Sequence, residues 1–270
     1  MTALADILAA TLRRVARDRS SCDLRDLERR ASDHAPRGFQ KALGARSEAG
    51  IAIIAELKRA SPSRGVIRQD FDCAQLAAEL EAAGATALSV LTDQEFFQGS
   101  LDNLRTASAV ASLPCLRKDF IIDEFQILEA RANCADAVLL IVAALSPQQL
   151  ASLAARAQEL ELDVLCEVHD QLELGFALDA GCTLIGVNSR DLRTFQTDLG
   201  TALRLAAHIP QNVLPVAESG IENGSDIARL REAGYRAFLV GETLMRAGQP
   251  GNALRTLLAE AGALTRVGLT

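Results

Sequence analysis

The sequence predicts an α/β fold: a single (β/α)8 TIM barrel with an N-terminal helical extension. Three observations predict it: short apolar β-like segments recur, helical stretches separate them, and no low-complexity linker divides the chain. We expect strands at 51–58, 87–92, 114–118, 137–143, 163–168, 184–188, 214–218 and 237–240. Eight β–α units in 270 residues suit one barrel. A doubly wound open sheet is the alternative, but it normally uses fewer strands, and no G-x-G-x-x-G motif follows the first strand.

The segments between the strands carry helix start and stop signals. A glycine precedes three of the predicted strands, at Gly84, Gly181 and Gly234. Glycine supplies the left-handed C-cap that turns a helix into the next strand. Ser146 and Pro147 open a helix over 147–160, with serine as the N-cap and proline at the first helical position.

The residues before the first strand are predicted to be helical. Apolar side chains recur there at helical spacing, at Leu4, Ile7, Leu8 and Leu12. We therefore expect residues 1–45 to form a helical extension packed on the barrel, and residues 46–270 to form the catalytic barrel domain.

Composition and charge narrow the functional classes. The net charge is −7 and the pI is about 5.1, which argues against a nucleic-acid partner. The longest apolar run, 137–145, is far shorter than the ~20 residues that span a bilayer, so we expect no membrane partner. The N-terminus lacks a basic stretch followed by an apolar one, which predicts a cytoplasmic protein.

The six cysteines predict no metal site and no disulfide framework. No two have C-x-x-C spacing, and Cys166 and His169 have no second pair to complete a zinc site. Several cysteines lie in apolar segments, which favours buried free thiols.

Polar residues stand where several predicted strands end. Catalytic side chains of such barrels come from the C-terminal ends of the strands. Five strands end in charged or amide groups: Glu56 and Lys58, Lys118, Glu167, Asn188 and Arg190, and Glu218 with Ser219. An ion-paired ring that only stabilises the barrel mouth is the alternative, but stability alone explains five such strands poorly.

The last two strands are followed by turns that suit a phosphate group. Ser219-Gly220 follows the seventh strand and Gly241-Glu242-Thr243 follows the eighth, where such barrels bind phosphate through backbone N–H groups. Ser61, after the first strand, could add a hydroxyl. Because a carboxylate repels phosphate, we expect the Glu242 side chain to turn away and its backbone N–H to contribute.

Five motifs carry a resemblance to a known family. They are Ala55–Gly65 (AELKRASPSRG), Leu116–Asp123 (LRKDFIID), Leu165–His169 (LCEVH), Gly186–Leu192 (GVNSRDL) and Ala217–Ile221 (AESGI). With these motifs the chain resembles indole-3-glycerol phosphate synthase over nearly its whole length. The resemblance implies closure of an indole ring in tryptophan biosynthesis, by conversion of 1-(2-carboxyphenylamino)-1-deoxyribulose 5-phosphate without metal or organic cofactor.

The resemblance also implies residue roles. The candidate catalytic residues are Lys118 as general acid, Glu167 in proton transfer, Glu56 and Lys58 in dehydration, and Asn188 and Ser219. The candidate substrate-binding residues are Ser61, Phe97, Phe120, Arg190, Glu218, Gly220, Gly241 and Glu242. Of these, the phenylalanines match residues near the anthranilate ring, and Ser61, Gly220 and Gly241 match phosphate contacts. Ser189 stands where many relatives have asparagine, and strand alternation turns it away from the barrel interior.

Several questions stay open at the level of sequence. A lysine among apolar walls is expected to have a lowered pKa, but which lysine serves which step is undecided. His169 is expected in a supporting or loop position, and Asp119 and Asp123 at the start of the helix after the third strand. A lysine Schiff-base aldolase and a barrel that only binds phosphate ligands are the alternative functions. A small phosphorylated substrate is the expected partner, and a monomer or weak homodimer the expected state.

Overall fold

The predicted barrel is confirmed. The computed structural model describes residues 3–191 and 194–267, so Leu192 of the fourth motif lies outside the described residues. Parallel strands close into one barrel in the spatial order β1, β10, β9, β8, β7, β6, β5 and β4. Their bounds are β1 (Ala52–Leu57), β4 (Ala87–Leu91), β5 (Cys115–Lys118), β6 (Ala137–Ile141), β7 (Asp163–Val168), β8 (Leu184–Asn188), β9 (Leu214–Glu218) and β10 (Ala237–Val240). Each matches an expected strand to within a few residues at either end.

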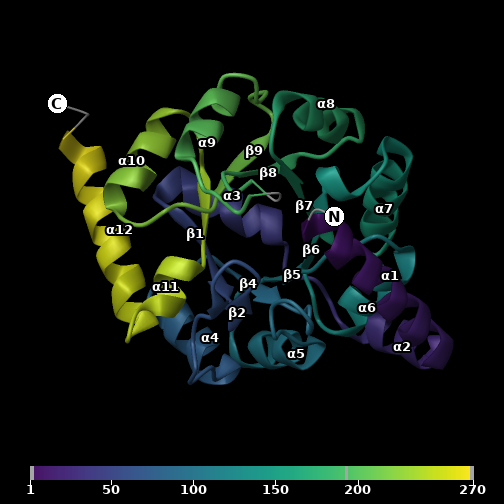
Figure 1. Cartoon of the computed structure of the whole chain (residues 1–270). Coiled ribbons are helices and arrows are strands. Elements are labelled where there is room, and N and C mark those ends of the chain that lie inside the picture. The colour runs from purple at the N-terminus through teal and green to yellow at the C-terminus, as the bar shows by residue number, and fades with distance from the viewer. Residues whose placement is uncertain (1–2, 192–193, 268–270) are drawn as a thin grey trace.

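Helices surround the strands (Figure 1). They are α4 (Cys73–Ala82), α5 (Leu101–Val110), α6 (Glu124–Ala132), α7 (Pro147–Glu159), α8 (Gln171–Asp179), α9 (Leu199–Ala206), α10 (Gly224–Glu232), α11 (Glu242–Arg246) and α12 (Pro250–Val267), with a 3-10 turn at Val142–Ala144. A small hairpin, β2 (Ala60–Ser61) and β3 (Gly65–Val66), lies in the loop after β1. No helix in the described part of the chain is long and apolar enough to cross a membrane.

The helix boundaries follow the expected local signals. Gly84, Gly181 and Gly234 have φ angles of 99°, 78° and 111°, so each adopts the left-handed conformation that side-chain-bearing residues avoid. Ser146 caps α7, and its side chain accepts the backbone N–H of Gln149 while the Gln149 side chain accepts that of Ser146.

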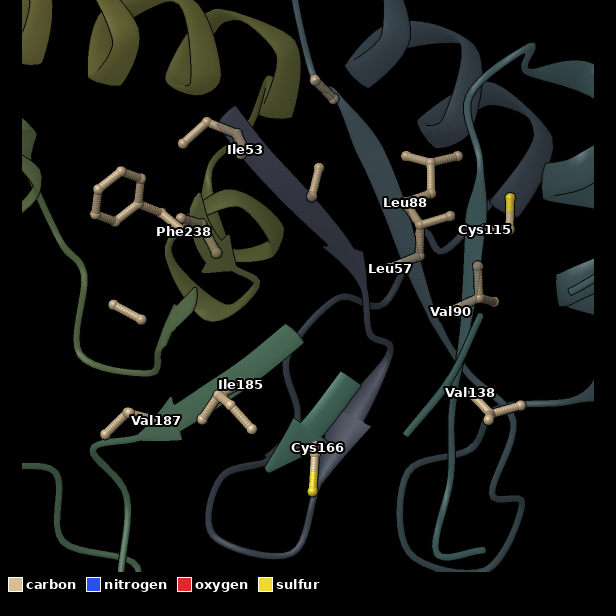
Figure 2. Packing of buried hydrophobic residues seen from close by; sticks show 14 of the residues in the cluster. Ile53, Leu57, Leu88, Val90, Cys115, Val138, Cys166, Ile185, Val187 and Phe238 are labelled. Atoms are coloured by element: carbon tan, nitrogen blue, oxygen red, sulfur yellow. The ribbon is translucent and has the colours of Figure 1, made fainter. Parts of the chain in front are cut away.

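Strand alternation divides the side chains between two cores. In β1, Ile53 and Leu57 join Leu88, Val90, Phe238 and others in the layer between strands and helices, as Figure 2 shows. Ala52 and Ile54 belong instead to the core inside the barrel. Glu56 shares their parity, so the same alternation that packs the core directs its carboxylate toward the barrel interior.

The N-terminal extension contacts both ends of the barrel. It consists of α1 (Ala3–Ser21), α2 (Leu24–Asp33) and α3 (Phe39–Ala49), so the expected boundary after residue 45 falls inside α3. Phe39 and Leu43 of α3 are fully buried in the interior core, and the backbone N–H of Gln40 binds Asp163 at the start of β7. Ile7 of α1 joins the same core together with Phe120, which follows β5. The extension therefore closes the N-terminal end of the barrel and covers part of its C-terminal end.

A buried carboxylate joins the extension to the barrel. Asp136, directly before β6, accepts hydrogen bonds from the Arg37 guanidinium at 2.6 Å and from the backbone N–H of Cys115 at 2.6 Å. His34 Nε2 lies 3.2 Å from the same carboxylate. Because an unpaired buried carboxylate is costly, this cluster stabilises the docked extension.

The six cysteines are free, as the sequence predicts, and Cys73, Cys115, Cys166 and Cys182 are buried.

Candidate active site

One cavity of about 1040 Å³ opens at the C-terminal ends of the strands. Every site residue proposed from the sequence lines it: Glu56, Lys58, Ser61, Phe97, Lys118, Phe120, Glu167, Asn188, Arg190, Glu218, Ser219, Gly220, Gly241 and Glu242. Residues that lie up to 186 positions apart in the chain are thus brought to one place by the closed barrel, since parallel strands end on the same side.

Lys118 lies at the centre of a charged cluster. Its Nζ donates to Glu218 Oε2 at 2.6 Å and to Glu167 Oε2 at 3.0 Å. Asn188 Nδ2 donates to the other oxygen of Glu167 at 3.0 Å. These residues lie in the last or next-to-last positions of β5, β7, β8 and β9, so four strands fix one ammonium group and its partners.

A second lysine and carboxylate pair comes from β1. Lys58 Nζ donates to Glu56 Oε1 at 2.6 Å, and both side chains are largely buried. Gly241 leaves room for this pair, because a Cβ atom at that position would lie 2.4 Å from Glu56 Oε1.

The pKa of Lys118 differs from the expectation. Burial alone would lower it, but the carboxylates of Glu167, Glu218 and Glu56 outweigh burial and raise the pKa above its ordinary value. The expected lowering was wrong because the walls nearest to the ammonium are carboxylates from three other strands. Lys118 is therefore a firmly held cation in the unliganded site.

The two acids beside Lys118 have different charge states. For both, burial raises the pKa. In Glu167, Lys118, His169 and the Asn188 amide reverse that effect and leave the pKa lowered. In Glu218, the nearby charge of Glu167 adds to burial, and the pKa rises to about 7. One acid is thus ionised and its neighbour titrates near neutrality, the separation expected of an acid–base pair.

One carboxylate oxygen of Glu218 is buried against β8. Its Oε1 is buried and has no hydrogen-bond partner within the described residues. A Cβ atom on Gly186 would lie 2.0 Å from this oxygen, so the glycine in β8 makes space for the carboxylate. Because a buried acceptor without a partner has lost its hydrogen bonds to water, this oxygen adds to the cost of ionising Glu218.

The turns after β9 and β10 face the same cavity. Ser219 and Gly220 have φ angles of 65° and 79°, so two successive residues are left-handed. Thr243 Oγ1 donates to the carbonyl of Ile221 at 2.6 Å, which ties the two turns together. In (β/α)8 barrels the loops after the last two strands frequently form a phosphate-binding site.

Arginines hold the Glu242 side chain, which was expected to turn away from a bound phosphate. Arg190 Nη2 lies 3.1 Å from Glu242 Oε2, and Arg64 Nε lies 3.1 Å from Oε1. Arg246 Nη1 also lies 3.4 Å from Oε1, so one carboxylate faces three guanidinium groups and the cluster keeps a net positive charge.

The apolar part of the cavity contains the two predicted phenylalanines and two residues of α1 that the sequence did not identify as part of the site. The ring centroids of Phe97 and Phe120 lie 6.3 Å apart at an angle of 38°. Leu4 and Ile7 of α1 line the same cavity. Their helical spacing was visible in the sequence, but only tertiary packing shows that α1 reaches the barrel mouth.

Two aspartates near the cavity have roles that the sequence did not indicate. Asp119 was expected at the start of α6, but it lies before that helix. Its side chain is fully buried and ion-paired with Arg14 of α1 at 2.7 Å and with Arg117 at 3.1 Å. Asp123 is the N-cap of α6, as expected. Asp93 also lines the cavity, and its position two residues after the end of β4 was the signal that could have identified it.

These features define an acid–base enzyme on a (β/α)8 barrel, with its charged and apolar side chains in one cavity. The family model for indole-3-glycerol phosphate synthase matches residues 4–257. The chain belongs to the indole-3-glycerol phosphate synthase family, the carboxy-lyases that form the indole ring in tryptophan biosynthesis.

Individual relatives agree with this assignment. Indole-3-glycerol phosphate synthase from Koribacter versatilis is 56% identical over 93% of this chain and 97% of its own length. The Bordetella pertussis enzyme is 51% identical over 95% of this chain and 98% of its own. Among solved structures, thiamine phosphate pyrophosphorylase from Pyrococcus furiosus has a TM-score of 0.60 and 16% identity, covering 82% of this chain and 98% of that chain. That last similarity shows the fold alone.

Proposed function

We propose that this chain converts 1-(2-carboxyphenylamino)-1-deoxyribulose 5-phosphate to indole-3-glycerol phosphate, carbon dioxide and water, with the side chains of the cavity in defined roles. The observation that carries the proposal is the placement of Lys118 Nζ between Glu167 and Glu218, in a cavity that also holds Phe97 and Phe120. A cavity that binds an aromatic acid joined to a phosphorylated sugar needs both an apolar region and an anion-binding region.

Substrate binding uses the two ends of the cavity. The anthranilate ring lies among Phe97, Phe120 and the apolar side chains of α1, where burial of aromatic area favours binding. The phosphate lies at the turns that contain Ser219–Gly220 and Gly241, with Ser61 as a hydroxyl donor. Arg190 supplies positive charge there once a phosphate competes with Glu242 for its guanidinium.

In the first step, the ring carbon that bears the carboxylate attacks the sugar ketone. A carbon–carbon bond forms, the carbonyl electron pair moves to oxygen, and Lys118 supplies the proton that this oxygen takes up. Because Glu167 and Glu218 hold the ammonium in place, little reorganisation is needed as charge develops on the oxygen.

Decarboxylation and dehydration complete the reaction. The condensed intermediate is a cation, so the electron pair of the breaking carbon–carboxylate bond returns to the ring and carbon dioxide leaves. In the last step the hydroxyl leaves as water and a carbon-bound proton is removed, which restores aromaticity. Lys58, held by Glu56, protonates the leaving hydroxyl, and Glu167 takes the carbon-bound proton.

The proposal is tested with the purified chain and 1-(2-carboxyphenylamino)-1-deoxyribulose 5-phosphate in the presence of a metal chelator. We expect indole fluorescence to rise and one equivalent of carbon dioxide to be released per turnover. A folded sample that binds the substrate without forming indole contradicts the proposed reaction. Covalent trapping of the substrate on Lys58 or Lys118 by borohydride would favour a Schiff-base reaction instead.

A further inference from the structure

His169 lies between two carboxylates just outside the cavity. It follows the last residue of β7, and its Nδ1 lies 3.0 Å from Oε2 of Glu173, in the first turn of α8. Its backbone N–H donates to the same oxygen at 2.7 Å. On the other side of the ring, Nε2 lies 3.5 Å from Oε1 of Glu167. The imidazole thus connects a partly exposed acid to a buried acid of the active site.

The two neighbours define the protonation state of the ring. A carboxylate only accepts hydrogen bonds, so Nδ1 carries a proton toward Glu173. A neutral ring would then direct the lone pair of Nε2 toward the negative charge of Glu167. The doubly protonated imidazolium is instead attracted to both acids. The buried Nε2 faces Glu167 at 3.5 Å without a hydrogen bond, and it has no hydrogen-bond partner in residues 3–191 and 194–267.

Charged groups around His169 come from several elements. Glu167 of β7, Glu173 of α8 and Glu218 of β9 act on the ring, and Lys118 of β5 is bound to the far oxygen of Glu167. Burial lowers the pKa of His169, but the hydrogen bond to Glu173 and the charge of Glu167 outweigh burial and raise it. Geometry and charge therefore favour the same cationic state.

We propose that His169 is a positioning residue: held by Glu173 as an imidazolium, it keeps Glu167 ionised and oriented for proton transfer. This inference rests on the reaction proposed above. Two cations and one amide hold the Glu167 carboxylate, namely Lys118, His169 and Asn188. When Lys118 gives its proton to the substrate oxygen, His169 is the cation that remains beside Glu167, so the base stays charged for the last step.

The pH dependence of kcat tests this role. In Glu173→Gln, an amide oxygen can still accept from His169 but the negative charge is gone, so the ring loses its proton at lower pH. In His169→Gln the cation is gone, so the pKa of Glu167 rises and the acidic limb of the kcat profile moves to higher pH by about one unit, with KM nearly unchanged. In Glu173→Gln the ring is still protonated at the acidic pH where Glu167 titrates, so we expect the acidic limb to stay in place and the lower pKa of His169 to appear in its own titration. Asp179→Asn removes one negative charge from the exposed end of the same helix and should leave the profile in place.

A second readout does not depend on activity. The chain has three histidines, so the imidazole signals can be followed individually by nuclear magnetic resonance and assigned with the His169→Gln variant. We expect His169 to titrate above the ordinary histidine value in the wild type and at a lower pH in Glu173→Gln. A neutral His169 ring across pH 6–8 in the wild type overturns the proposal, as does an unchanged kcat profile in His169→Gln. Loss of the proposed function would instead appear as a wild type without turnover, while the titration would still report on the imidazolium.

Discussion

At the scale of single residues, Glu218 combines two opposing requirements. It is fully buried, its Oε1 lacks a hydrogen-bond partner within the described residues, and its pKa is raised to about 7 by burial and by Glu167. In the unfolded chain the same carboxyl would titrate near 4.5. A group with these properties destabilises the folded protein and is retained where a reaction uses it.

The stability of a Glu218→Gln variant tests this reading. Between pH 4.5 and about 7 the folded wild type holds a proton that the unfolded chain has lost, so its stability falls as pH rises. The neutral amide has no such dependence. We therefore expect the variant to gain roughly 2 kcal/mol relative to wild type between pH 5 and pH 8, measured by urea unfolding. Glu95→Gln, at an exposed glutamate, serves as the control. An equal difference at both pH values would contradict the assignment.

The sequence pattern predicted which way the site side chains point, but it did not predict their pKa shifts. The alternation of apolar residues in β1 and β5 identifies Glu56 and Lys118 as facing the barrel interior, because side chains two apart share a face. The sign of the pKa shift of Lys118 could not be predicted in the same way. It depends on distances to Glu167 and Glu218, which lie on other strands and become neighbours only when the barrel closes.

At the scale of elements, α1 is both a wall of the cavity and a docked helix. Leu4 and Ile7 line the cavity, and Arg14 fastens the helix to the buried carboxylate of Asp119. Arg14 Nη1 also lies 3.9 Å from Oδ2 of Asp93. Both aspartates lie in loops that follow strands of the barrel. The charged contacts of Arg14 and the burial of Ile7 and Val15 together hold α1 in place.

An Arg14→Ala variant tests this dependence. Asp119 keeps Arg117 but loses one charged partner, which should cost about 1–3 kcal/mol of unfolding free energy. Because α1 then docks less firmly, we expect KM to rise several-fold more than kcat falls. Arg17→Ala, on an exposed face of the same helix, is the matched control. Steady-state kinetics and urea unfolding measure both effects, and a KM equal to that of the control would exclude a role for α1 in substrate binding.

Element boundaries were predictable where local chemistry decides them. The glycines at 84, 181 and 234 and the Ser146 cap act on residues within one turn of the chain. The helix ends that they set can therefore be predicted from the local sequence. The place of α1 against the barrel mouth and the burial of Asp119 depend on contacts between residues about 100 positions apart. Amphipathic spacing indicates that α1 buries one face, but it does not indicate which part of the protein that face packs against.

At the scale of the whole molecule, we propose that the extension and the barrel unfold as one unit. Phe39 and Leu43 of α3 are part of the interior core, and Asp136 binds Arg37 at the same end of the barrel. The division at residue 45 then separates two parts of the sequence that share one hydrophobic core.

A Phe39→Ala variant tests this cooperativity. Removing a fully buried ring should lower the unfolding free energy by about 3–5 kcal/mol, and Phe39→Leu by less. The chain has one tyrosine and no tryptophan, so the fluorescence of the buried Tyr235 reports on the barrel, while circular dichroism reports on all helices. We expect the two transitions to coincide in both variants. Loss of helix signal ahead of the tyrosine transition would show that the extension unfolds separately.

The central claim is that Lys118, held by Glu167 and Glu218, performs the chemistry of this cavity. The most direct measurement is the turnover of 1-(2-carboxyphenylamino)-1-deoxyribulose 5-phosphate by Lys118→Ala, compared with wild type in samples whose folding and substrate binding are checked by circular dichroism and calorimetry. We predict a loss of roughly 10³-fold in kcat with the fold intact and the substrate still bound. A kcat within tenfold of the wild-type value would contradict the account.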